Sequence, residues 1–187
     1  HEIPVGNDGD FSWKRFGEVY QSKLGNQLGN MLNRVLVMLK KEDTDLTILD
    51  GGPEVPETMK QWAQYAESMD AFEIHKAVQQ ATDDISQLNE LFNTQAPWMI
   101  KDNPAKKLEI LSNFAECLRH VALMLLPFIP ESAQKMSLQL GVPYAPSMLD
   151  KDFVVTDAMK TWNGVKDWKR TGEPSILFPK VEEAPAA

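Results

Sequence analysis

Asn30 and Arg34 form the polar pair in this sequence that is best suited to binding a ligand. They are four residues apart, and side chains at i and i+4 share one face of a helix, so both can reach the same ligand. Asparagine offers a donor and an acceptor together, and arginine offers a rigid fork of donors. A solvated helix face explains such a pair equally well. Asparagines disfavour a helix interior, however, and Asn26 and Asn33 lie beside the pair, which indicates selection for something other than folding.

Trp98 is the third side chain of interest, and it follows Gln95-Ala96-Pro97 in a predicted loop. An aromatic ring at the end of a helix commonly packs into the core. Alternatively, its face is a platform for an unstacked base, an interaction that contributes about 1–3 kcal/mol per base. An amide, a guanidinium and an indole together can read unpaired bases. We therefore expect single-stranded RNA as the ligand, on condition that Trp98 lies beside Asn30 and Arg34.

The composition limits the class of protein. The 187 residues can bury one core, and 43% hydrophobic with 25% charged residues is typical of a globular domain. With 19 Lys and Arg against 27 Asp and Glu, the net charge of −8 argues against a bulk electrostatic grip on phosphates. No apolar run approaches the roughly 20 residues that cross a bilayer, so we expect no membrane partner. A single cysteine, Cys117, and three scattered histidines predict no disulfide and no metal site, and they suit a reducing compartment.

Apolar residues at helical spacing predict an all-α fold, an antiparallel bundle of about four to five helices. The expected helices begin near Ser12 (capped by Asp10) and at Leu24, and continue over 58–68, 71–93, 104–126 and 131–140, with a loop over 42–56. We expect residues 1–23 to be a linker and first helix, 24–141 the bundle, and 142–187 an irregular tail that packs back on it. Gly25 and Gly29 weaken their helix, which predicts close packing of another element there.

Three ionisable residues have structural rather than catalytic interpretations. His120 lies in an apolar helix and is expected to be a hydrogen-bonded core histidine. Glu109 and Glu116 are interpreted as ordinary surface charges. No catalytic triad, phosphate-binding glycine loop or pair of carboxylates stands out, so we expect no catalytic residue and no cofactor in this chain.

Several segments resemble those of a known family and occur in the same order: Glu2-Ile3-Pro4 followed by Asp8-Gly9-Asp10-Phe11-Ser12, Leu28-Gly29-Asn30-Met31-Leu32-Asn33-Arg34, Gln95-Ala96-Pro97-Trp98, Leu126-Pro127-Phe128-Ile129-Pro130-Glu131-Ser132-Ala133, Trp162-Asn163-Gly164 and Leu177-Phe178-Pro179-Lys180-Val181-Glu182. Together they resemble the C-terminal part of the methionyl-tRNA synthetases. The segment at 126–133 is shared by the leucyl, isoleucyl and valyl enzymes. Gln95-Ala96-Pro97-Trp98 and the helix around Arg34 favour the methionine enzyme.

The resemblance implies the anticodon-binding domain of a class I aminoacyl-tRNA synthetase. Trp98 would stack on an anticodon base, and Asn30 and Arg34 would bond to base edges of the methionine anticodon, CAU. The implied partners are the anticodon loop of tRNA(Met) and a parent catalytic domain in cis. That domain, before His1, would bind ATP and, in members with the metal-bearing insertion, zinc. The parent would be a cytoplasmic methionine–tRNA ligase, and this chain alone would be inactive.

Lys135-Met136-Ser137 superficially matches the Lys-Met-Ser-Lys-Ser loop of class I synthetases, but it lies on a predicted helix and lacks the last two residues of that loop. We interpret it as a coincidence. The alternatives that stay open are a non-enzymatic helical protein-interaction domain and the anticodon module of a leucyl, isoleucyl or valyl synthetase.

Overall fold

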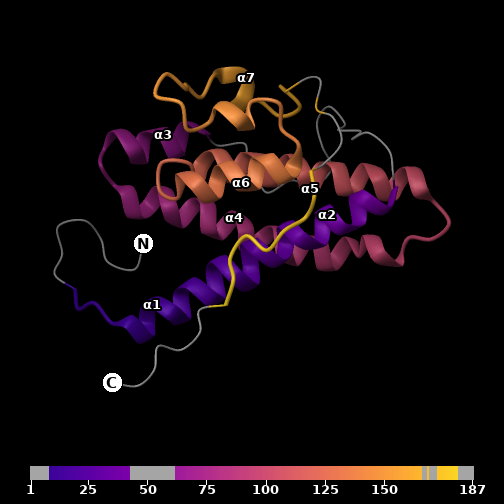
Figure 1. Ribbon diagram of the computed structural model, residues 1–187, viewed down its shortest axis with the longest axis horizontal. Coiled ribbons are helices and arrows are strands. Elements are labelled where there is room, and N and C mark those ends of the chain that lie inside the picture. The colour runs from indigo at the N-terminus through magenta and orange to yellow at the C-terminus, as the bar shows by residue number, and fades with distance from the viewer. Residues whose placement is uncertain (1–8, 43–61, 166–167, 169–171, 181–187) are drawn as a thin grey trace.

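A computed structural model describes residues 9–42, 62–165, 168 and 172–180, and within these ranges the chain has helices and no strands (Figure 1). The predicted all-α fold is confirmed. The α-helices are α1 (Trp13–Val19), α2 (Asn30–Glu42), α3 (Trp62–Asp70), α4 (Ile74–Gln95), α5 (Pro104–Leu125), α6 (Pro130–Leu140) and α7 (Asp157–Lys160). A π-helix, η1 (Tyr20–Gly29), and the 3-10 turns η3 (Pro97–Met99) and η4 (Ala145–Ser147) complete these elements. Residues 43–56 of the predicted loop and the predicted helix start at Thr58 lie outside the described residues.

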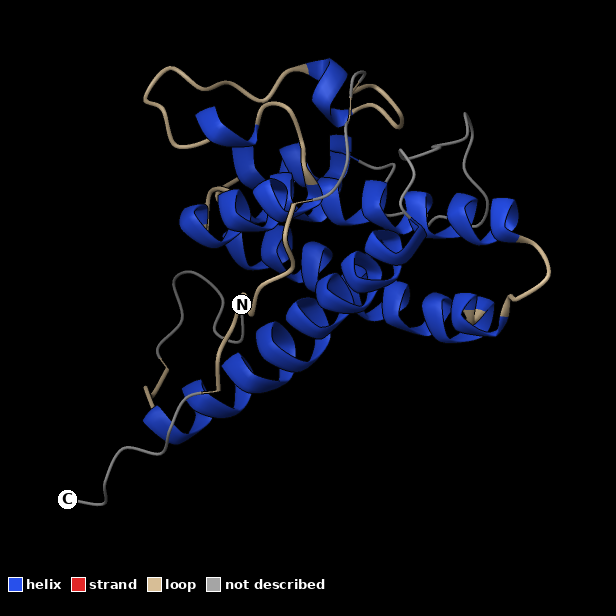
Figure 2. Cartoon of the chain, turned by 45° about the vertical axis from the view of Figure 1, so that its right-hand side comes forward, coloured by secondary structure: helices blue, strands red, loops and turns tan. Residues whose placement is uncertain are grey.

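α1, η1 and α2 form one long helical rod, whose α1 end projects beyond the other helices (Figure 2). The cap of this rod is Ser12 and not Asp10 as predicted, because the Ser12 side chain accepts a hydrogen bond from the Arg15 N–H at 3.3 Å. The two helices expected near Ser12 and Leu24 are thus one, and the rod runs uninterrupted across residue 23.

α5 is the centre of the bundle and packs against α2, α4 and α6. Asn103 caps it by accepting the Lys106 N–H at 3.0 Å, and Pro104 is its first residue, as the sequence predicts. Every residue from 110 to 125 is buried. A helix that is buried on all sides has no solvent-facing stripe, so its polar residues are inside the bundle as well.

α6 lies against α5 and ends as predicted at Gly141, which takes the left-handed conformation with φ 75°. Lys135, Met136 and Ser137 lie within this helix, and the last two are buried. This confirms that they form a helical turn and not an exposed loop.

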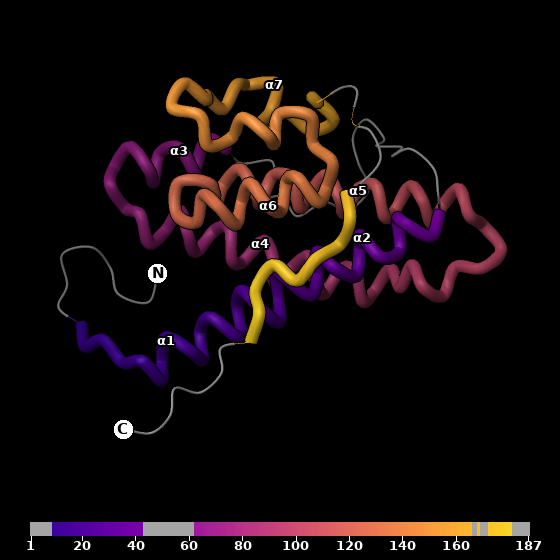
Figure 3. The backbone as a smooth tube through the Cα atoms, viewed as in Figure 1, coloured from indigo at the N-terminus to yellow at the C-terminus, as the bar shows by residue number. Residues whose placement is uncertain are grey.

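The described part of residues 168–180 lies along the bundle, and the segment 172–180 follows the rod from α2 towards α1 (Figure 3). Trp168 donates its indole N–H to the Leu140 carbonyl at 2.7 Å, and Lys40 pairs with Glu173 at 2.5 Å. A Cβ on Gly29 would lie 3.3 Å from the ring of Phe178, which confirms the close packing expected there. At Gly25 the close neighbour is only the flexible Gln21 side chain of the same helix. No helix in the described ranges is long and apolar enough to cross a bilayer.

Candidate nucleic-acid interface

α2 presents Asn30 and Arg34 away from the core. Its opposite face is buried in the bundle through Met31, Leu32, Val35, Leu36 and Leu39. Asn30 is the first residue of α2 and is exposed, whereas Arg34 is half-buried. Four residues advance an α-helix by about 6 Å, so the amide and the guanidinium lie within the reach of one ligand.

The way in which α4 ends places Trp98. α4 stops at Gln95 because Ala96 takes a left-handed conformation (φ 41°, ψ 58°), with its N–H donating to the Phe92 carbonyl at 3.0 Å. Pro97 then opens η3 and is buried, while Trp98 is 43% exposed. The Trp98 ring centroid lies 5.6 Å from that of Phe92, a fully buried side chain. The indole is therefore anchored on the core and still open to solvent.

Arg34 and Trp98 meet at the surface, although they are 64 positions apart in the sequence. The Arg34 guanidinium carbon lies 5.1 Å from the centroid of the Trp98 ring and 4.6 Å from that of Phe92. Its Nη2 donates to Oδ1 of Asn93, in the last turn of α4, at 3.3 Å. The indole is neither sealed in the interior nor remote from Arg34, so the part of the stated condition that concerns Arg34 is met.

The guanidinium of Arg34 has a defined position, and most of its hydrogen-bond donors are not used within the described structure. Arginine has five N–H donors, and one of those of Arg34 is hydrogen-bonded within the part of the chain that the structure describes. Each ring beneath the cation contributes on the order of 0.5–1 kcal/mol at such a partly exposed position. Arg34 therefore has a defined position and retains donors for a ligand.

Two further residues belong to this site, and the sequence did not single them out. Phe92 lies within the predicted helix 71–93 and is fully buried, and its ring packs beneath Arg34 and Trp98. Asn93 was taken only as the end of a helix. An asparagine in the last turn is common at helix ends, so its type and position gave no signal of the contact with Arg34.

A second polar cluster lies inside the bundle on α5. Arg119 makes two hydrogen bonds to the Glu116 carboxylate, Nε to Oε2 at 2.7 Å and Nη2 to Oε1 at 2.6 Å. His120 accepts the Trp62 indole N–H on Nδ1 at 3.0 Å, while its Nε2 faces Glu116 at 3.4 Å. All three α5 side chains are buried. The interpretation of His120 as a hydrogen-bonded core residue is confirmed.

The interpretation of Glu116 as a surface charge is wrong. α5 has no solvent face at this point, so the carboxylate is inside, where Arg119 compensates its charge. Burial on its own would raise the pKa of Glu116, but the hydrogen bonds and charges of Arg119 and His120 outweigh it and bring the pKa to about 2. Burial lowers the pKa of His120. Glu109, by contrast, is partly exposed and pairs with Lys106 at 2.6 Å, as expected of a surface charge.

The buried cluster also fastens the segment after α6. Arg119 donates to three oxygens of that segment: the hydroxyl of Tyr144 and the carbonyls of Met159 and Thr161. In return, the Asn163 N–H donates to Glu116 at 2.8 Å. Gly164 follows, and a Cβ there would lie 2.1 Å from the Ala158 carbonyl oxygen, so no larger residue fits without rearrangement. This gives a structural reason for Gly164 in the sequence.

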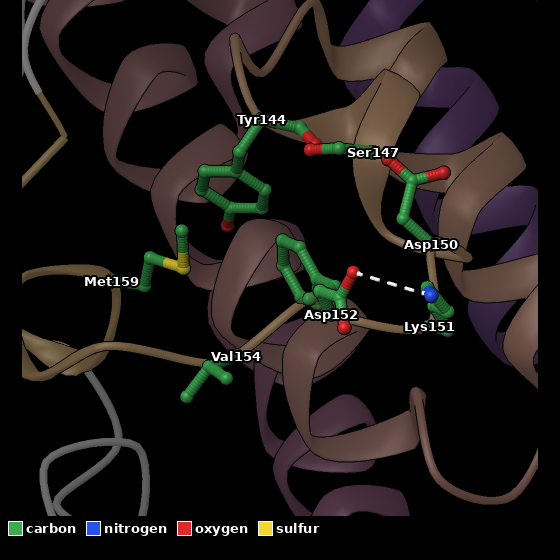
Figure 4. Close-up of a pocket in the computed structure, with 8 residues that line it drawn as sticks. Tyr144, Ser147, Asp150, Lys151, Asp152, Val154 and Met159 are labelled. Atoms are coloured by element: carbon green, nitrogen blue, oxygen red, sulfur yellow. Dashed lines mark hydrogen bonds and ion pairs between the residues drawn. The ribbon is translucent and has the colours of Figure 1, made fainter.

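A surface hollow of about 530 Å³ lies over this segment (Figure 4). It is lined by residues between Tyr144 and Met159, and its one ion pair joins Lys151 and Asp152 at 4.0 Å, both exposed. None of Asn30, Arg34 and Trp98 lines it. This hollow is therefore separate from the Arg34 site.

Metal ligation and thiol chemistry find no support in the described residues. No group of three or more His, Cys, Asp or Glu side chains there is placed to hold a metal ion. Cys117 is free and buried, and burial raises the pKa of its thiol well above the usual value, so it stays protonated. The surface around Arg34 and Trp98 can bind a ligand through hydrogen bonds and aromatic stacking.

Comparison with known proteins agrees with these features. Residues 54–187 match the family model of the anticodon-binding domain of methionyl-tRNA ligase. The methionine–tRNA ligase of Fusobacterium nucleatum is 34% identical over 97% of this chain, and that of Bacillus subtilis is 33% identical over the same share. The chain spans 29% and 28% of the lengths of these two relatives.

A similar fold occurs in solved structures. The apo form of the methionyl-tRNA synthetase from Mycobacterium tuberculosis superposes with a TM-score of 0.78 at 22% identity. The superposition covers 98% of this chain and 38% of the chain in that structure. The arrangement of helices is therefore similar well beyond the sequence similarity.

Proposed function

Since the chain belongs to the methionyl-tRNA synthetase family, as its anticodon-binding domain, we propose that Asn30, Arg34 and Trp98 bind the CAU anticodon of methionine tRNA. The observation that carries this proposal is the position of the Arg34 guanidinium, 5.1 Å from a Trp98 ring that is 43% exposed. A planar stacking surface and a free donor fork thus lie within one nucleotide of each other. That is the combination by which proteins recognise unstacked bases in RNA loops.

The chemistry of the bases fits these groups. Trp98 offers its exposed face to one anticodon base, and such stacking tolerates any base, so it supplies affinity rather than sequence choice. Choice comes from the base edges. The Watson–Crick edge of cytosine has two neighbouring acceptors, N3 and O2, that suit the donor fork of Arg34. It also has an amino group that can donate a hydrogen bond to the Asn30 carbonyl oxygen. Uracil presents a donor where cytosine has N3, so it would face Arg34 with the wrong polarity.

The acidic composition limits how this surface can bind RNA. A net charge of −8 gives no broad attraction for phosphates, so the affinity of this domain must come from a few placed contacts. We propose that a catalytic domain in cis holds the rest of the tRNA. We assign to that parent enzyme the binding of ATP, the binding of zinc where the insertion is present, and the joining of methionine to tRNA in the cytoplasm. We assign no step of that reaction to the residues described here.

The direct test is Trp98→Ala with a synthetic RNA stem-loop that carries CAU. We expect the affinity to fall by about 1–3 kcal/mol, measured by fluorescence titration with a labelled RNA, because the stacking platform is lost. Circular dichroism should show an intact bundle, since Phe92 remains to fill the core beneath the ring. Unchanged binding by a folded Trp98→Ala protein would rule out the proposed role of this residue.

A suitable control is Trp13→Ala, which removes an indole that is 78% exposed on α1. It should leave binding of the stem-loop unchanged. A second RNA with a scrambled anticodon separates the remaining alternative: equal binding of both RNAs would point to a protein-interaction domain and away from anticodon recognition. Stronger binding of a leucine, isoleucine or valine anticodon would contradict the CAU assignment.

A further inference from the structure

Asn93 makes the polar contact that holds the Arg34 side chain from the opposite helix. It lies in the last turn of α4, is exposed, and accepts the Arg34 Nη2–H on Oδ1 at 3.3 Å. Arg34 is on α2, 59 residues earlier. This hydrogen bond therefore links α2, which carries Asn30 and Arg34, to the end of α4, which leads into the turn η3 that carries Trp98.

The other contacts of Arg34 do not fix its orientation. The rings of Phe92 and Trp98 lie 4.6 Å and 5.1 Å from the guanidinium carbon. Attraction between a cation and a ring depends on distance and height above the ring, and it leaves rotation of the guanidinium in its own plane nearly free. A hydrogen bond from one Nη to a fixed oxygen selects the direction in which the remaining N–H groups point. Among the described contacts of Arg34, Asn93 is the one that can do this.

The neutrality of Asn93 matters as much as its position. A carboxylate at this place would pair with Arg34 through a charge-assisted bidentate bond and would occupy two of the donors. It would also place a negative charge beside an incoming RNA. The amide offers one oxygen, which here accepts a single hydrogen bond from Arg34, and it carries no charge that would cancel that of the guanidinium.

We propose that Asn93 is a positioning residue for recognition of the anticodon, acting through Arg34. This inference rests on the proposed function of the site. Asn93 orients the guanidinium so that its remaining N–H groups point towards the base that stacks on Trp98. Because Asn93 is uncharged, the positive charge of Arg34 is not neutralised. Its contribution should then exist only when Arg34 is present.

A double-mutant cycle tests this dependence. The titrations use the CAU stem-loop with wild type, Asn93→Ala, Arg34→Ala and the double variant. We expect Asn93→Ala to weaken binding by about 3- to 10-fold, the usual size of one hydrogen bond. In the Arg34→Ala background the same change should alter binding by less than about two-fold. Equal losses in both backgrounds would overturn the proposal, because Asn93 would then act on the RNA directly or on the fold.

Two more variants separate positioning from a loss of structure. Thr94→Ala is the matched control, because Thr94 is exposed on the same helix turn and, within the described ranges, its hydroxyl donates to the Glu90 carbonyl of its own helix at 3.0 Å. It should leave binding unchanged. Asn93→Asp keeps an acceptor at the site but should weaken binding at least as much as Asn93→Ala. Full affinity in Asn93→Asp would contradict the argument from neutrality.

The failure of this inference is distinguishable from failure of the proposed function. Should the wild-type domain bind CAU and scrambled stem-loops equally, the proposed function is wrong whatever Asn93 does. Should the wild type prefer CAU while Asn93→Ala matches it in affinity and preference, only the positioning role is wrong. If Asn93→Ala does not fold, Asn93→Leu, which keeps the approximate size of the side chain and removes the acceptor, takes its place in the cycle, with the same two outcomes.

Discussion

Two arginines of this domain lie against aromatic rings, and they differ in what becomes of their donors. Arg34 has two rings beside it and one hydrogen bond within the described structure. Arg119 is fully buried, 6.0 Å from the Trp168 ring, and bonds the Glu116 carboxylate twice as well as several oxygens of the chain. The first guanidinium keeps donors for another molecule, and the second has none to spare.

The difference follows from where each helix places its arginine. A charge inside a protein must be paired and hydrogen-bonded, because an uncompensated one costs several kcal/mol. Arg119 lies on the helix that is buried on every side, so its partners are internal and it joins α5 to the segment after α6. Arg34 lies at the edge of the bundle, where water satisfies its free donors until a ligand replaces the water. One cluster therefore supports the fold, and the other is available for recognition.

The largest expected effect comes from breaking the buried cluster. Glu116→Ala removes the carboxylate and leaves the Arg119 charge buried without its partner, so we expect a loss of about 3–5 kcal/mol in the free energy of unfolding. Urea denaturation followed by circular dichroism measures it. Glu109→Ala, on the same helix, removes one member of the more exposed Lys106 pair and should cost under about 1 kcal/mol. Similar losses in both variants would mean that the cluster has no special role.

Acid should weaken the buried cluster before the Arg34 site. The pKa of Glu116 is about 2 in the folded chain against an ordinary 4.5, so its stabilising contribution is complete above pH 4.5 and is lost as the pH falls towards 2. The pKa of His120 is lowered from 6.5, and its contribution likewise fades as the pH falls below 6.5. Between pH 7 and pH 3, we expect the cluster to lose on the order of 2–3 kcal/mol of stability, measured by thermal unfolding.

Glu116→Gln is the matched variant for the pH experiment. It retains the shape of the side chain and removes the titrating group, so its stability at pH 7 should be lower and should fall less steeply with acid. An acid dependence as steep as that of the wild type would show that other carboxylates, and not Glu116, determine it.

The sequence was sufficient to predict those parts of the fold that depend on near neighbours. Asn103 followed by Pro104 predicted the start of α5, and Gly141 predicted the end of α6, because caps are local interactions. Asn30 and Arg34 could be placed on one helix face for the same reason. The spatial meeting of Arg34 and Trp98 could only be stated as a condition, since it depends on how two distant helices pack.

The misinterpretation of Glu116 has a different cause. Helical spacing identifies one buried stripe, and it fails for a helix whose whole circumference is buried. A signal was nevertheless present, because Arg119 follows Glu116 by three residues and could compensate it inside the bundle. Asn93 gave no comparable signal, since its partner is in another helix.

Replacing each arginine by lysine should have opposite effects at the two sites: Arg34→Lys should affect RNA binding, and Arg119→Lys should affect stability. Arg34→Lys should weaken binding of the CAU stem-loop by about 1–2 kcal/mol in fluorescence titrations, because an ammonium group cannot present two parallel donors to a base edge. Its free energy of unfolding should stay within about 0.5 kcal/mol of wild type, since the residue is at the edge of the bundle. Arg119→Lys should do the opposite: it cannot satisfy Glu116 and the carbonyl of Thr161 at once, so stability falls, while the molecules that remain folded bind the stem-loop as before. Loss of binding in folded Arg119→Lys protein would mean that the two clusters are coupled through the bundle, and the division between support and recognition would then be wrong.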